Sequence, residues 1–129
     1  MSISHKFDFT WSNGGTPVTG SVSPTGDTED NREFTVAGTT TDQQVALAFT
    51  KTKLQAILIS SDQTVTLYTN DLHSGTPQDT ITITANKPFV WYTGSGIANP
   101  FGGNVSTSYW SNAGASTATV KVKTLSQFT

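Results

Sequence analysis

Hydrophobic and polar residues alternate in short runs along most of the chain, and residues that favour turns separate these runs. The alternation is clearest in residues 7–11, 64–69, 79–84 and 117–125. A period of two residues is the side-chain repeat of a β-strand, so each run predicts a strand with one apolar face. No segment keeps a helical period. Residues 41–53 come nearest, but their β-branched content favours strand there too.

About nine or ten short strands are predicted at the spacing of an antiparallel two-sheet sandwich, so the expected fold class is all-β. The 129 residues suffice for one hydrophobic core, which predicts a single domain over residues 1–129. Phe7, Phe9 and Trp11 share one face of the first strand and are expected in the core. That strand is expected to turn at residues 13–15 and to pair with residues 18–23. Residues 24–31 are expected to form an acidic loop before a short strand around Phe34 and Val36.

Two segments are apolar on both faces, which a simple sandwich strand is not. Residues 56–59 form a continuous apolar run, typical of a strand covered on both sides. In residues 89–92 the alternation sends Phe89 and Trp91 to one face and Val90 and Tyr92 to the other. The second face requires a cover: residues 97–101 folding back, a neighbouring subunit or a ligand. Tyr109 and Trp110 repeat this two-faced pattern one strand later. The candidate partner interface therefore comprises Tyr92, Ile97, Phe101 and Trp110.

The charge distribution argues against a nucleic-acid partner. The formal net charge is −2, the isoelectric point is near 5.4, and the seven basic residues are spread along the chain, whereas nucleic acids require clustered positive charge. The first residues lack the apolar core of a signal peptide and no segment is long enough to span a membrane, so we expect synthesis in a cytoplasm and no membrane partner. The chain has no cysteine, so disulfides and thiolate metal sites are excluded.

No residue pattern predicts catalysis or a cofactor. Asp71, His73 and Asp79 come nearest to a metal cluster, but their polar segment is more typical of a solvated turn. The acidic stretch containing Asp27, Glu29, Asp30 and Asn31 lacks the order of a calcium loop, so an ordinary acidic loop is the default. No Gly-x-Ser-x-Gly motif is present. We therefore predict no catalytic, cofactor-binding or metal-binding residues and no enzyme activity.

The chain from Leu54 onward resembles the head decoration, or cement, proteins of tailed bacteriophages. The resemblance lies in the order of strands and turns over residues 54–125: AILISSDQTVTLYTN at 56–70, DTITITA at 79–85, KPFVW at 87–91, VSTSY at 105–109, NAG at 112–114 and ATVKVKTL at 118–125. It implies a jelly-roll-like sandwich that assembles as a trimer or dimer and binds the major capsid protein on the outside of the virion. Residues 1–53 lie outside the resemblance and are a candidate attachment segment.

Two other functions remain open from the sequence. A glycan- or receptor-binding module of a virion fibre or cell surface would use exposed Trp91, Tyr92 or Trp110 to stack on sugar rings. A shell-forming jelly roll is less favoured, because no basic arm for a genome is visible.

Overall fold

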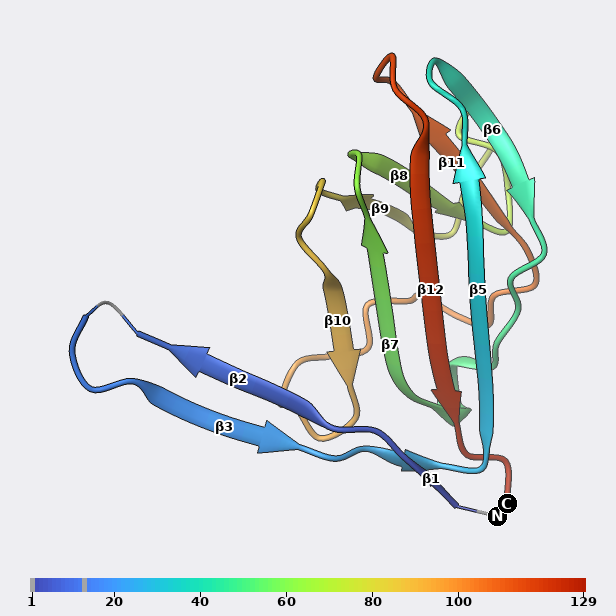
Figure 1. Ribbon diagram of the computed structural model, residues 1–129. Coiled ribbons are helices and arrows are strands. Elements are labelled where there is room, and N and C mark those ends of the chain that lie inside the picture. The colour runs from blue at the N-terminus through green and yellow to red at the C-terminus, as the bar shows by residue number, and fades with distance from the viewer. Residues whose placement is uncertain (1, 13) are drawn as a thin grey trace.

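The computed structural model describes residues 2–12 and 14–129, and its body consists of two four-stranded antiparallel sheets (Figure 1). The first sheet has the order β10 (Phe89–Tyr92), β7 (Leu54–Ser61), β12 (Ala118–Ser126), β5 (Thr28–Val36). The second has the order β6 (Thr40–Val45), β11 (Ser108–Asn112), β8 (Val65–Thr69), β9 (Thr80–Ile83). With these eight strands counted in chain order, the sheets read 6-3-8-1 and 2-7-4-5. This is the arrangement of a jelly roll, so the predicted all-β sandwich is confirmed.

The core lies between the two sheets and is made by the inward positions of the alternating strands. Ile57 and Ile59 of β7, Val120 of β12 and Leu67 of β8 are fully buried there. Trp110 of β11 is also fully buried, and its ring meets Phe34 edge to face at a centroid distance of 5.1 Å. A short 3-10 turn, Lys51–Lys53, leads into β7.

Residues 2–12 and 14–26 lie outside the jelly roll and form an arm. β1 (Ile3–Ser4) pairs with β4 (Thr25–Gly26) at the root, and β2 (Phe7–Trp11) pairs with β3 (Val18–Val22) as a hairpin. In Figure 1 this hairpin runs past the lower end of β10 and projects away from both sheets. The predicted pairing of residues 7–11 with 18–23 is therefore confirmed, whereas Asn13 of the predicted turn lies outside the described residues.

The arm overturns the expectation that Phe7, Phe9 and Trp11 are core residues. Phe7 is half-buried, Phe9 is 44% exposed and Trp11 is 79% exposed. The alternation did predict a strand with one apolar face. A hairpin that leaves the body, however, has no second sheet to cover that face.

The acidic stretch also differs from the expectation. Residues 28–36 form one nine-residue edge strand, β5, rather than a loop followed by a short strand. All nine residues of β5 are in register with β12, from Ser126 opposite Thr28 to Ala118 opposite Val36. Long-range pairing thus overrides the weak strand preference of Asp, Glu and Asn. The charged side chains also suit an edge, because they discourage pairing with another chain.

Candidate interaction surface

The outer face of the first sheet changes from apolar at β10 to charged at β5. Strand register places Tyr92, Ala56, Leu125 and Glu29 in one row across this face, and Val90, Leu58, Lys123 and Asn31 in the next. Side chains in such rows are neighbours on one face of a sheet. The second apolar face predicted for residues 56–59 and 89–92 is therefore real, and it occupies the β10–β7 side of the sheet.

The arm covers part of this apolar face. The Phe7 ring stacks on Tyr92 at a centroid distance of 5.8 Å, and Phe9 lies 6.2 Å from Tyr92. Leu125 is fully buried beneath Gly26, where an added Cβ would lie 2.5 Å from the Ser126 carbonyl oxygen and 2.9 Å from the Leu125 side chain. Glycine is therefore required for the arm root to approach β12 so closely.

Asp27 ties the arm root to the last residues of the chain. Its carboxylate accepts hydrogen bonds from the amides of Phe128 and Thr129, both at 3.0 Å, and from the Thr129 and Thr28 hydroxyls. These bonds, the Thr129 hydroxyl first and the Phe128 amide next, lower the pKa of Asp27 from its usual 3.8 to about 2. The arm is thus anchored at its root by packing and by an ionised carboxylate.

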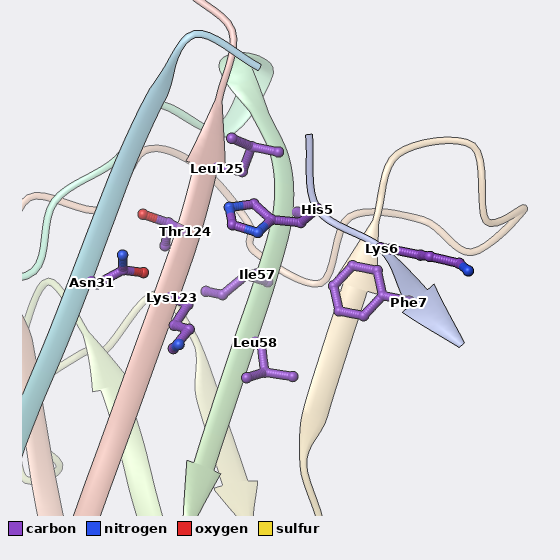
Figure 2. Close-up of a pocket in the computed structure, with 10 residues that line it drawn as sticks. His5, Lys6, Phe7, Asn31, Ile57, Leu58, Lys123, Thr124 and Leu125 are labelled. Atoms are coloured by element: carbon purple, nitrogen blue, oxygen red, sulfur yellow. The ribbon is translucent and has the colours of Figure 1, made fainter. Parts of the chain in front are cut away.

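A groove remains open between the arm and the sheet (Figure 2). It has a volume of about 130 Å³ and is bounded by His5 and Phe7 on one side and by the outer face of β7 and β12 on the other. Ala56, Leu58 and Leu125 line it, Leu58 with a half-buried side chain and the other two with buried ones, and Lys123 lies at the side toward β5. His5 Nε2 lies 3.2 Å from Glu29 Oε2, so an ion pair is available at the edge of the groove when His5 is protonated.

The distal half of the arm exposes a second apolar surface. Phe9 and Trp11 share one face of β2, and Val18, which is 69% exposed, lies directly opposite Trp11 on β3. The other face carries Asp8, Thr10 and their partners, and is polar. We call Phe9, Trp11 and Val18 the arm tip. Its sequence signal is the absence of any charged residue between Asp8 and Asp27.

The four candidate interface residues do not form one surface. Phe101 is fully buried and packs edge to face on Phe49 at 4.8 Å. Trp110 is fully buried, and its indole N–H donates to Ser108 Oγ at 2.8 Å. Both therefore belong to the core and are removed from the candidate surface. The alternation at Tyr109 and Trp110 could not say which of the two faces points inward.

The remaining two candidates have different environments. Tyr92 is half-buried under the arm, so its cover comes from residues 7 and 9 of the same chain. Ile97 is 72% exposed in the turn after β10, where Gly94 and Gly96 adopt positive φ angles. The Ile97 carbonyl accepts a 2.9 Å bond from the Trp91 indole, which holds Trp91 against the core.

The acidic residues weighed as ligands have partners within the chain. Asp71 accepts the amides of Leu72 and Thr76, which lowers its pKa, and Asp79 accepts the Gly102 amide at 2.8 Å. His73 Nδ1 lies 2.6 Å from Asp42 Oδ2. On β5, Asp30 pairs with Arg32 at 2.9 Å.

Glu29, the other acidic residue of β5 weighed as a ligand, accepts a bond from the Asn31 amide group. That bond and, second, His5 lower the pKa of Glu29. Over residues 2–12 and 14–129, no three His, Asp or Glu side chains gather as a metal site.

Comparisons with known proteins add no relative. No protein-family model, curated protein or solved structure matches the chain. Within its described part, no helix is long and apolar enough to cross a membrane. The arm tip and the groove are therefore interpreted from their own chemistry.

Proposed function

We propose that this protein is a non-enzymatic structural protein of a bacteriophage virion, which decorates the outside of the capsid and stabilises it by bridging capsid subunits. The proposed partners are the major capsid protein and further copies of this chain, as a trimer or dimer. Neither a nucleic acid nor a membrane is proposed as a partner.

The observation that carries the proposal is a jelly-roll body with a projecting arm whose apolar tip is uncovered. A contiguous exposed apolar patch on a projecting hairpin marks a site that another molecule covers, and a neighbouring protein surface is the cover proposed here. A repeated shell suits such a protein, because several modest contacts made by linked copies add up to strong attachment. The order of strands and turns in residues 54–125 supports the same function through the resemblance to decoration proteins.

The decisive experiment is the copy number of the chain in purified virions, measured by quantitative mass spectrometry relative to the major capsid protein. A ratio near one is expected for a decoration protein. A few copies per particle would instead indicate a fibre or tail component, and absence from virions would contradict the proposal. Recombinant protein should also co-sediment with heads that lack it.

A glycan- or receptor-binding module is the second candidate, and one observation favours it: Trp11 is 79% exposed on a hairpin. The residues first considered for sugar stacking are poorly placed, because Trp91 and Trp110 are buried and Tyr92 is stacked under Phe7. A glycan screen read by tryptophan fluorescence tests this candidate. A response that disappears in Trp11→Ala would support it, and no response across diverse sugars would count against it.

A further inference from the structure

We propose that the arm tip of one copy docks into the groove on the outer sheet face of a second copy. The occupant of the groove is thus the hairpin of another chain, with Trp11 as its anchor. The inference concerns contacts between copies and holds whether or not the protein binds a capsid.

The contact between the arm and Tyr92 within each chain indicates what kind of surface covers the arm tip. Phe7, Phe9 and Trp11 lie on one face of β2, and the first two meet Tyr92 on the outer sheet face. The hairpin then extends past β10, the edge strand of that sheet (Figure 1). Phe9 and Trp11 on this part of β2 are exposed. Phe9 and Trp11 belong to the same apolar face as Phe7, so a surface like the one that Phe7 covers would suit them as well. The outer sheet face of a second copy is such a surface.

The groove is complementary to the arm tip in chemistry. Leu58 remains half-buried with the arm root in place and provides the accessible part of the groove floor, beside the buried Ala56 and Leu125. Figure 2 shows His5 and Phe7 flanking this floor, with the Lys6 side chain pointing away from it. The hairpin of the same chain leads away from β7 and β12 (Figure 1), the strands that line the groove, so the arm tip would fill the groove of another copy rather than its own.

The charge pattern favours a protein surface of this kind over a charged ligand. No charged residue lies between Asp8 and Asp27, and depletion of charge is typical of the centre of an interface. Lys123, at the side of the groove toward β5, stays exposed beside its floor. Docking therefore need not bury an unpaired charge, which would be costly.

The area available agrees with reciprocal docking. Aromatic side chains bury about 150–250 Å² each, so the exposed parts of Phe9, Trp11 and Val18 amount to roughly 300–400 Å². One such contact is small beside the ~800 Å² per partner of a stable interface. A copy that docks its own arm tip into a second copy, and also holds the arm tip of a second copy in its groove, buries close to that area. Reciprocal or ring-closed exchange is therefore favoured over a single contact.

The first experiment measures association of the purified full chain by analytical ultracentrifugation and by tryptophan fluorescence. Trp91 and Trp110 are buried, so a change with concentration reports mainly on Trp11. We expect a blue shift on association. Trp11→Ala should weaken association about 30-fold or more, as for a hot-spot residue. Thr10→Ala, on the polar face of the same strand, is the matched control and should associate like the parent chain.

The second experiment tests whether the groove is the docking site and whether each contact joins one arm tip to one groove. Leu58→Asp introduces a carboxylate opposite Lys123 on the same sheet face, which favours folding, while docked Trp11 would have to bury that charge. Leu58→Thr is a milder second variant. Trp11→Ala alone and Leu58→Asp alone should each associate much more weakly than the parent chain. Their mixture should form complexes, because the intact arm of one fits the intact groove of the other.

Three outcomes would overturn the inference. The first is a parent chain that stays monomeric at near-millimolar concentration with Trp11 exposed. The second is association of folded Leu58→Asp at the parent strength, which would indicate arm-to-arm contact. The third is equal weakening by Trp11→Ala and Thr10→Ala. All measurements are made without capsids, so failure of the docking inference and failure of the proposed function are distinguishable. Copies can fail to associate although the protein co-sediments with heads, and they can associate although it does not.

Discussion

Strands β2 and β10 each carry three aromatic side chains on short alternating runs, yet their environments are opposite. On β10, Trp91 is buried against the core and its indole N–H donates to the Ile97 carbonyl. On β2, Trp11 is 79% exposed. β10 pairs with β7 inside a sandwich, whereas β2 pairs with β3 in a hairpin that leaves the body. Burial of an aromatic strand thus depends on the layer packed against it, and local alternation does not determine that layer.

The largest expected difference is in the free energy of unfolding lost when Trp110 or Trp11 is replaced by alanine. Trp110→Ala should lower the free energy of unfolding by about 3–5 kcal/mol, because it leaves a cavity beside Phe34 and removes a satisfied indole. Trp11→Ala should change it by less than about 0.5 kcal/mol at low protein concentration. Urea denaturation of both variants measures the two changes in the free energy of unfolding. Equal effects would contradict the placement of the arm outside the core.

Two glycines of the arm sharpen the comparison between its root and its hairpin. Gly26→Ala should cost about 1–3 kcal/mol, since the new Cβ would lie 2.5 Å from the Ser126 carbonyl oxygen and the root must shift. Gly20→Ala is the matched control, because a Cβ there meets no atom within 4 Å. Thermal unfolding of the two variants checks the prediction. Similar melting temperatures would show that the root does not press on β12.

The contact of Phe7 with the sheet is expected to contribute less free energy than the packing of the arm root on β12. Phe7→Ala removes the ring stacked on Tyr92, a type of pair worth about 0.5–1.5 kcal/mol. Amide hydrogen exchange should accelerate in β2 and β3 and stay unchanged in β7 and β12. Thr10→Ala serves as the control. Acceleration throughout the body would mean that the arm and the jelly roll unfold as one unit.

The smallest expected effect is electrostatic, and it is a loss of stability as the pH falls into the acid range. The pKa of Asp27 is about 2 in the folded chain and near 3.8 when unfolded, so its hydrogen bonds stabilise the fold fully above pH 3.8. That contribution should disappear as the pH falls from about 4 through 2. Asp27→Asn should remove this part of the pH dependence. Urea midpoints of both chains between pH 6 and pH 2 test it, and a constant difference would contradict the assignment.

The sequence predicted the parts of this molecule that depend on local pattern. Period-two alternation correctly indicated most strands, the β2–β3 pairing and the two-sheet sandwich. Strand was also expected over residues 41–53, but β6 ends at Val45 and residues 51–53 form a 3-10 turn. It also indicated that residues 56–59 and 89–92 are apolar on both faces. Of the candidate surface, Ile97 is exposed as expected, and Tyr92 lies on the outer sheet face beneath the arm.

Alternation alone could not predict which face of a strand is covered, or by what. The same pattern placed Phe7, Phe9 and Trp11 in the expected core and Trp110 on the candidate surface, whereas Phe7 is half-buried, Phe9 and Trp11 are exposed and Trp110 is buried. Phe101, nominated because its segment could cover β10, is also buried. It could not predict that residues 28–36 would form a strand, because their pairing partner, β12, lies some ninety residues further along the chain.

What the sequence determined by itself is the all-β class, because side-chain periodicity is a property of the local backbone. What only the tertiary structure decided is the role of the arm, residues 2–12 and 14–26. Whether an apolar strand face becomes core, covers a sheet or remains exposed depends on contacts between residues far apart in the chain. In this protein those contacts cover Tyr92 with Phe7 and leave Trp11 without a cover.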